Sequence, residues 1–145
     1  MSSDAVTLAD LTSTDWSLAL DRSTPTQTAG SGIGLVVQGV ADINQCISII
    51  LSTPPGTDPL RPTFACDLLS WLDKPLAVAR SGISSAVITA IALWEPRVLV
   101  VPPIVINPGI LGQLVIYLTW RLKSSSPIAG ANQQLVLTLP NPSAT

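Results

Sequence analysis

The residues with the clearest potential for chemistry are Glu95 and Arg97, which flank Pro96. Glu95 is the only glutamate, and charged residues make up 11% of the chain. About 25% is typical of a soluble domain. In an extended backbone, side chains two residues apart project to the same side. We therefore expect Glu95 and Arg97 to lie together as an ion pair.

This pair does not resemble a catalytic site. Glycoside hydrolysis needs two carboxyl groups on either side of a bond, one of them a proton donor. The chain has one Glu and eight Asp, most of them in predicted caps and loops. An arginine beside Glu95 favours the ionised carboxylate, which cannot act as a general acid. Histidine is absent, which removes Ser-His and Cys-His catalysis and most transition-metal sites. The residues predict no enzyme activity, no metal site and no cofactor.

Two other groups of residues also favour a structural interpretation. The segment Gly30-Ser31-Gly32-Ile33-Gly34 is rich in glycine. However, it lacks the strand before it, the helix after it and the lysine of a phosphate-binding loop, so we interpret it as a flexible loop. For Cys46 and Cys66, two small buried hydrophobic residues are favoured over a disulfide.

Glu95 lies where a helical pattern gives way to a strand pattern. Pro96 has no N–H and disfavours the α conformation at Glu95, so the helix must end there. A strand rich in Val and Ile follows over 98–106. The reverse face of the helix (Ser81, Ser85, Thr89, Ala92) is small and uncharged, which favours contact with another subunit. Apolar residues with helical spacing predict a helix over 76–94; they are Ile83, Val87, Ala90, Ile91 and Trp94.

An earlier helix is predicted to begin at Asp42, with Gln45 completing a capping box. It ends at Thr53-Pro54-Pro55-Gly56. A loop rigidified by prolines follows over 57–64, and Phe64 is expected to plug the core. Residues 65–72 then predict a short helix. The apolar stripe of the earlier helix consists of Ile43, Cys46, Ile47, Ile50 and Leu51.

The C-terminal third alternates between apolar and polar residues with the period of a strand. Every even position from Ile110 to Leu122 is apolar or Gly, and Leu135, Leu137 and Leu139 repeat the pattern. With 98–106, these segments predict a three-stranded antiparallel meander whose first turn is Asn107-Pro108-Gly109.

The fold class is therefore α+β, with two to three helices packed on a small antiparallel sheet of about three C-terminal strands. Short strands are expected over 15–20 and 33–38. We assign residues 1–32 to an extended, flexible N-terminal arm that includes the Ser/Thr/Gly/Pro-rich tract 23–32. Residues 33–145 form the domain.

Composition favours a component of a permanent assembly. The mean hydropathy is +0.50 and the net charge is −2, whereas a freely soluble monomer carries more charge. Obligate interfaces are apolar and depleted in charge. No basic cluster indicates a nucleic-acid partner. The stretch between Arg97 and Arg121 is uncharged, but Pro and Gly interrupt it, so it does not predict a membrane span. The N-terminus shows no secretory signal.

Taken together, the ordered motifs resemble the small baseplate wedge subunit of contractile phage tails, the gene-product-twenty-five-like family. Relatives occur in phage-tail-like bacteriocins and, as TssE, in type VI secretion. The resemblance covers roughly Gly39 to Leu139. It rests on Asp42-Ile43-Asn44-Gln45-Cys46-Ile47, on 49–56 with Pro55 and Gly56, on Asp58-Pro59-Leu60-Arg61-Pro62, on Phe64 and on Trp94-Glu95-Pro96-Arg97.

The resemblance implies a structural, non-enzymatic role in the tail baseplate of a virion, assembled in the host cytoplasm. Glu95, Pro96 and Arg97 would hold the helical core bundle of the larger wedge subunits. The C-terminal strands would start the first ring of the tail sheath protein by strand addition. Hub, spike or tube-proximal proteins are further candidate partners, and several copies would enter a sixfold baseplate. The residues implied for strand addition are Val115, Tyr117, Thr119, Leu135 and Leu137; those implied as structural motif are Pro55, Gly56, Arg61, Pro62, Phe64 and Trp94.

The sequence departs from the family pattern at two positions. Thr63 stands where the family often has an acidic residue, and Ala65 stands where it usually has Gly. A turn with positive φ at Ala65 would be strained. Two alternatives remain: a particle-associated peptidoglycan hydrolase of lysozyme type, and a soluble anti-adaptor regulator that shares this fold family.

Overall fold

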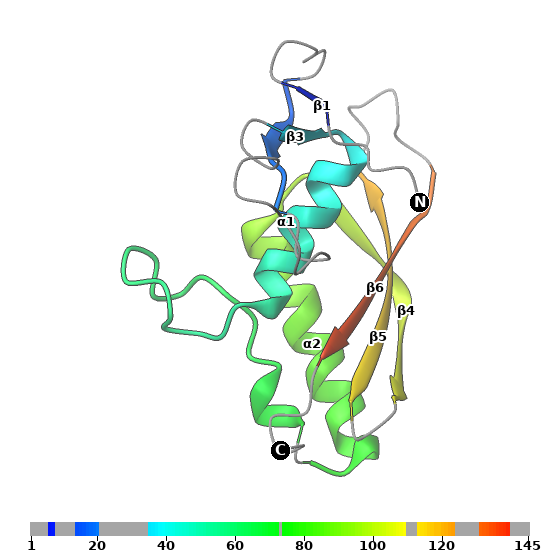
Figure 1. Ribbon diagram of the computed structural model, residues 1–145. Helices are drawn as coiled ribbons and strands as arrows, with labels where there is room; N and C mark the ends of the chain where they lie inside the picture. Colours follow the sequence, from blue (N-terminus) through cyan, green and yellow to red (C-terminus); the bar gives the residue numbers. More distant parts are fainter. Residues whose placement is uncertain are drawn as a thin grey trace. The chain divides into compact units, whose positions relative to one another are not determined.

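A computed structural model describes residues 6–7, 14–20, 35–72, 74–109, 113–123 and 131–139 (Figure 1). The chain divides into two compact units, residues 1–46 and 47–145. Helices and two small antiparallel sheets make the fold α+β, as the sequence predicts.

The first unit contains a small sheet of three short strands. They are β1 (Val6–Thr7), β2 (Trp16–Leu18) and β3 (Leu35–Gln38), in the order β1-β3-β2 with antiparallel pairing. Strand β2 is shorter than the strand predicted over 15–20, and β3 lies within the strand predicted over 33–38, whose first two residues are outside the described residues. Val36, at the centre of the sheet, is buried. Two short strands fall within the predicted arm, whereas the tract 23–32 and the glycine-rich segment 30–34 lie outside the described residues.

Helix α1 (Val40–Ser52) begins earlier than the capping-box prediction, which is wrong. Gly39 takes a φ of +59° between β3 and the helix, and its N–H donates to the carbonyl of Asp15 (3.2 Å). Asp42 therefore lies inside the first turn. The Gln45 side chain does not cap the helix but binds residues 17–20, in and just after β2. Its Oε1 accepts from the Leu20 N–H (2.8 Å), and its Nε2 donates to Leu18 O (2.7 Å) and Ser17 Oγ (2.9 Å).

The apolar stripe of α1 is confirmed. Its members Ile43, Ile47, Ile50 and Leu51 are buried, and Cys46 is half-buried.

The predicted helix over 65–72 is wrong in length. Only a 3-10 turn forms, η2 (Leu69–Trp71). Before it, the Cys66 N–H donates to the carbonyl of Thr53 (3.4 Å), which closes the loop after α1. A helix that began at residue 65 would compete with this bond. Asp67 then accepts hydrogen bonds from the backbone and hydroxyl of Ser70 (3.4 and 2.8 Å).

Helix α2 (Leu76–Trp94) has the predicted bounds and packs against strand β4 (Val98–Pro108). The predicted reverse face is exposed: Ser81, Ser85, Thr89 and Ala92 all face solvent in this chain. By length and composition α2 could also cross a membrane, a test that core helices of soluble proteins pass as well. Its buried residues are Ala79, Ile83, Val87, Ala90 and Ile91.

The C-terminal meander is confirmed. Strands β4, β5 (Leu114–Leu122) and β6 (Gln133–Leu139) pair antiparallel in the order β4-β5-β6. The predicted first turn comes too early, because Asn107 and Pro108 still pair in β4. The connection closes where the Gly109 N–H donates to Gln113 O (2.6 Å), and residues 110–112 within it lie outside the described residues. The even positions of β5 form the inner face: Leu114, Ile116, Leu118 and Trp120 are buried.

Candidate functional site

The corner between α2 and β4 consists of Glu95, Pro96 and Arg97. The Glu95 N–H makes the last helical bond, to Ile91 O (2.8 Å), and the backbone then leaves the helix at φ −128° and ψ 71°. This is the stop that Pro96 predicts. The Val98 N–H donates to Glu95 O (3.1 Å), closing a tight turn over Pro96 and Arg97. The Arg97 carbonyl accepts from the Lys123 N–H (2.9 Å), next to the end of β5. Backbone bonds thus fix the corner on both sides.

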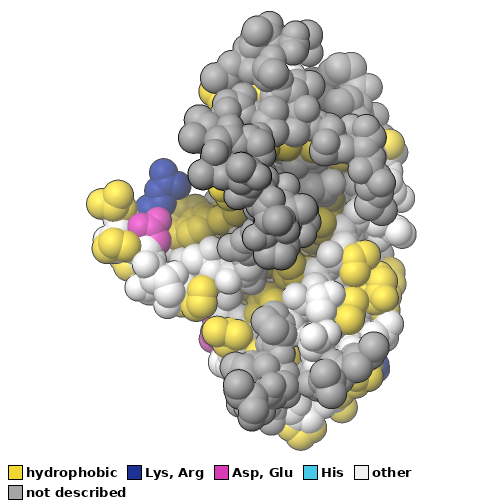
Figure 2. Space-filling model, viewed as in Figure 1, with side chains coloured by type: hydrophobic (Ala, Val, Ile, Leu, Met, Phe, Trp, Pro, Cys, Tyr) yellow, Lys and Arg dark blue, Asp and Glu magenta, His cyan; other side chains and the backbone are white. Residues whose placement is uncertain are grey.

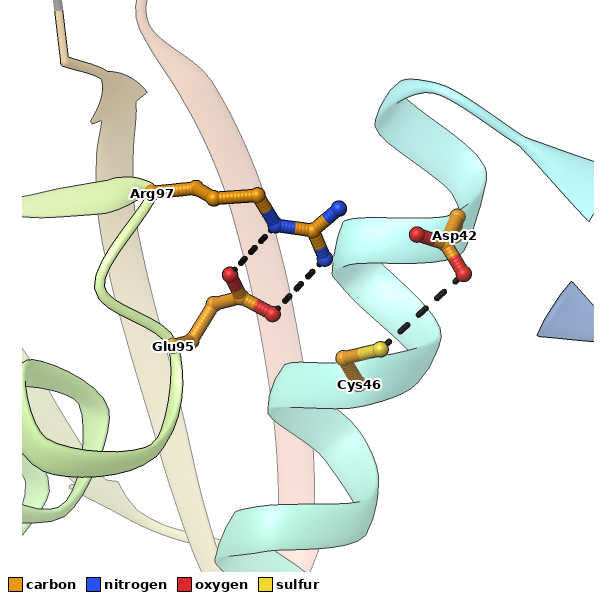
Figure 3. Close-up of polar contacts among 4 residues, drawn as sticks. All are labelled: Asp42, Cys46, Glu95 and Arg97. Atoms are coloured by element: carbon orange, nitrogen blue, oxygen red, sulfur yellow. Dashed lines mark hydrogen bonds and ion pairs between the residues drawn. The ribbon is translucent and has the colours of Figure 1, made fainter. Parts of the chain in front are cut away.

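Within this corner, Glu95 and Arg97 form the predicted ion pair (Figure 3). Arg97 Nε donates to Glu95 Oε1 (2.6 Å) and Nη2 donates to Oε2 (2.9 Å). Paired bonds between guanidinium and carboxylate fix both orientation and distance. Glu95 is 5% exposed, whereas the Arg97 side chain is 35% exposed. The buried carboxylate therefore orients a cation that still reaches the surface.

This arrangement favours recognition over catalysis. Both oxygens of the Glu95 carboxylate accept hydrogen bonds from the Arg97 guanidinium, so neither is left open toward a substrate in this arrangement. In the part of the chain that the structure describes, no group of three or more His, Cys, Asp or Glu residues is placed to hold a metal ion. The chemistry open to the corner is a charged, directional contact with another molecule.

The motif residues divide into two groups. Phe64 and Trp94 meet edge to face, with ring centroids 5.1 Å apart and ring planes at 71°. Phe64 is only half-buried, so the prediction that it plugs the core is wrong; it supports the end of α2 next to Glu95. Four others, Pro55, Gly56, Arg61 and Pro62, lie exposed on the loop between α1 and η2.

The residues predicted for strand addition lie on opposite faces of the C-terminal sheet. Val115, Tyr117 and Thr119 are on the outer face of β5. Leu135 and Leu137 pair with Leu118 and Ile116, which places them on the inner face of β6. Since β5 is the central strand, its backbone is already paired on both sides. Only β4 and β6 have an open edge within the described sheet.

Sequence reasoning missed one apolar row on this sheet. Val105, Tyr117 and Val136 are cross-strand neighbours on the outer face, one on each strand. They are 43%, 44% and 54% exposed, respectively. The alternation of each strand indicates which residues face outward, but only the register shows that these three form a row.

A second buried acid was also missed. Asp42 and Glu95 are the buried charged residues among those described. Asp42 lies one helical turn before Cys46, and the Cys46 Sγ approaches its Oδ1 at 4.0 Å (Figure 3). Neither Cys46 nor Cys66 forms a disulfide, as the sequence favours, although only Cys66 is fully buried. Burial, assisted by the charge of Asp67, raises the pKa of the Cys66 thiol to about 12.

Comparison with known proteins places this corner in a family context. Residues 37–108, which include α1, α2 and the Glu95–Arg97 corner, match the model of the family described as baseplate wedge protein gp25. No curated protein matched the chain.

The solved structures that are similar to the chain include the following two. One, from Geobacter sulfurreducens, is provisionally described as a tail lysozyme; it is 28% identical, with a TM-score of 0.55, and the match covers 68% of this chain and 87% of that one. The other is a chain of the pyocin R2 baseplate after contraction, which is 25% identical, with a TM-score of 0.55 and coverage of 63% and 93%. The match of α1 to β4 with the wedge model, and the baseplate fold of the pyocin chain, agree with the motif order in the sequence. The chain belongs to the gp25-like baseplate wedge family, whose members are structural proteins of contractile tail baseplates.

Proposed function

We propose that this baseplate protein uses the corner of Glu95, Pro96 and Arg97 to hold the helical core bundle of the larger wedge subunits. The observation that carries the proposal is the asymmetry of the ion pair, in which a buried Glu95 orients a partly exposed Arg97. A guanidinium presents its N–H donors in a rigid plane, and two bonds to Glu95 fix the orientation of that plane in Arg97. The fixed orientation lowers the entropy lost when the exposed edge meets acceptors on a partner helix.

The corner is tested by removing both charges together. A single Arg97→Ala change would strand the buried Glu95 carboxylate, at a cost of about 3–5 kcal/mol. Reduced incorporation of that single variant could then result from misfolding as well as from loss of the contact with the partner. In the double variant Glu95→Gln/Arg97→Gln both partners of this ion pair lose their charge together, so we expect urea unfolding close to that of the wild type. We also expect its incorporation into wedge complexes, measured by co-purification, to fall at least tenfold. Wild-type incorporation of the folded double variant would refute the clamp.

We further propose that strand β6 starts the first sheath ring by accepting an added strand. The two open edges of the sheet differ. Strand β4 contains Pro102 and Pro103, which lack N–H donors, and its pairing with β5 shifts between Val101 and Val105. Such an edge is a poor template for a further strand. Strand β6 contains no proline and pairs with β5 without interruption from Gln133 to Leu139. This regularity supports β6 as the receiving edge.

The proposed role is not catalytic, although the similar Geobacter structure is described as a tail lysozyme. The ion pair that commits both oxygens of Glu95 to Arg97 supports this view. The discriminating measurement is the turbidity of a peptidoglycan suspension. We expect the purified protein to leave it unchanged. A loss of turbidity that disappears with Glu95→Gln would establish the hydrolase instead.

A further inference from the structure

The loop between α1 and η2 has a defined internal structure. We call residues 54–64 the projecting loop, because the segment extends away from α2 (Figure 1). Its first turn is closed by the Thr57 hydroxyl, which donates to Pro54 O (2.7 Å). At the tip, Asp58 Oδ1 accepts from the Leu60 N–H (2.9 Å), and Asp58 O accepts from the Arg61 N–H (3.3 Å). The returning arm is bent by a bond from the Phe64 N–H to Arg61 O (2.8 Å).

The base of the projecting loop is anchored at both ends. The Cys66 N–H donates to Thr53 O (3.4 Å), which joins the two arms. The Thr53 hydroxyl donates to Ile49 O (2.6 Å) in the last turn of α1. On the other arm, Phe64 packs edge-on against Trp94, immediately before Glu95. The loop is therefore held on both helices, and its four prolines restrict it further.

The tip of this loop presents an apolar side chain to solvent. Leu60 is 90% exposed, the highest value among the large hydrophobic residues described. Figure 2 shows apolar, basic and acidic side chains gathered on the projecting part of the surface. A single exposed leucine needs no explanation. Here, however, hydrogen bonds and prolines order the loop, although the Leu60 side chain at its tip packs against no other part of the described chain. Such preorganisation lowers the cost of binding, and so it suits a partner that buries Leu60.

The charges at the tip indicate the chemistry of that partner. Asp58 uses one oxygen within the loop. Arg61, next to Leu60, is exposed, and no residue in the described part of the chain forms an ion pair with it. A leucine beside an unpaired guanidinium fits an apolar pocket with a carboxylate at its rim.

We propose that the projecting loop is a second docking element, whose Leu60 enters an apolar pocket of a neighbouring baseplate protein while Arg61 meets an acidic side chain at the rim. The inference rests on the baseplate role of the chain but not on the Glu95–Arg97 clamp. The Phe64–Trp94 contact connects the two elements, so the position of the loop is set relative to the corner.

The test uses complete tail particles from cells that express wild-type and variant chains together, with the ratio incorporated measured by mass spectrometry. We expect Leu60→Ser to be depleted at least about tenfold relative to wild type, the lower end of what one buried leucine contributes, and Arg61→Glu to be depleted as well. The matched control is Leu69→Ser, because Leu69 is 48% exposed and lies outside the loop; its ratio should stay near that of wild type. Urea unfolding of each variant should match the wild type, which excludes misfolding as the cause.

Photo-crosslinking identifies the partner. With Leu60→p-benzoylphenylalanine, irradiated particles should yield a crosslink to one baseplate protein, at a peptide with apolar residues and at least one Asp or Glu. Equal incorporation of Leu60→Ser and wild type, or no crosslink from position 60, would overturn the proposal. The two proposals can fail independently. If the double variant Glu95→Gln/Arg97→Gln assembles normally while position 60 still crosslinks, the corner is not the clamp and the loop proposal stands.

Discussion

At the scale of single residues, Ala65 shows the strain that the departure from the family pattern predicts. Its φ is +142°, the only positive φ at a non-glycine residue in the described chain. A side chain in such a conformation costs about 1–3 kcal/mol. The strain occurs at the base of the projecting loop, directly after Phe64, where the chain turns back toward Thr53.

Ala65→Gly should therefore stabilise the protein. Glycine loses more conformational entropy on folding than alanine, which costs about 0.5–1 kcal/mol of stability. The strain that is relieved at Ala65 is larger, so we expect a net gain of about 1 kcal/mol in the free energy of urea unfolding. The matched control is Gly56→Ala on the same loop. Gly56 has a φ of +79°, and an added Cβ would meet nothing within 4 Å. That change should destabilise by about 1–2 kcal/mol through conformation alone. A destabilising Ala65→Gly would contradict the strain.

Cys66 gives a prediction about pH. Burial first, and the charge of Asp67 second, raise the pKa of its thiol from 9.0 to about 12. Above pH 9 the unfolded chain releases this proton while the native chain keeps it, so stability falls as pH rises. The difference in unfolding free energy between wild type and Cys66→Ala should be constant below pH 9 and should shrink between 9 and about 12. Other titrating groups cancel in this difference. Parallel curves throughout that window would show that the thiol is not buried as described.

At the scale of elements, sequence patterns located the helices and strands but not the details that depend on tertiary contacts. The bounds of α2 follow from local causes, an apolar stripe and Pro96. The start of α1 does not follow from local causes. The Gly39 N–H, just before the helix, donates to the carbonyl of Asp15, which lies far away in the sequence. Gln45 resembled a capping residue, yet its side-chain amide bonds to the backbone of Leu18 and Leu20.

The candidate site was predictable to a similar degree. Spacing alone predicted that Glu95 and Arg97 would meet. The burial of Glu95 with exposure of Arg97 could not be predicted, because it depends on packing around the corner. The same holds for the faces of β6: alternation fixes which residues share a face, but the pairing of Leu135 with Leu118 shows which face is inner.

Packing between η2 and α2 gives a prediction at this scale. A Cβ added at Gly82 in α2 would overlap the ring of Trp71, which also lies under the Lys74 ammonium at 4.0 Å. We expect Gly82→Ala to lower the unfolding free energy, because overpacking costs about 1–3 kcal/mol against a gain of about 1 kcal/mol in helix propensity. The double variant Gly82→Ala/Trp71→Leu should cost less than the sum of its single changes, because the ring no longer obstructs the new methyl group. Additive costs would mean that the two residues do not meet.

At the scale of the whole molecule, residues 47–145 carry three features suited to assembly: the Glu95–Arg97 corner, the projecting loop and the β6 edge. They draw on different interactions: a charge, an apolar side chain and backbone hydrogen bonds. This division is consistent with the low charge of the chain. Obligate interfaces need few charges, and hydrogen bonds hold the Glu95 and Arg97 side chains at the corner and the Asp58 carboxylate at the loop tip.

The outer row of the C-terminal sheet offers a direct test of which edge receives a sheath strand. Val105, Tyr117 and Val136 lie side by side on β4, β5 and β6 with similar exposure, so a lysine can be placed on each strand in turn. A charge on an edge strand opposes the addition of a further strand. If β6 is the receiving edge, Val136→Lys should reduce the number of particles with an assembled sheath, counted by electron microscopy, while Val105→Lys and Tyr117→Lys assemble normally. Equal loss in all three variants would indicate that sheath protein docks on the outer face, and loss confined to Val105→Lys would assign the edge to β4. All three substitutions place the same charge on the outer face, and urea unfolding of each variant measures its effect on stability, so a difference in sheath assembly between equally stable variants reports the position of the strand.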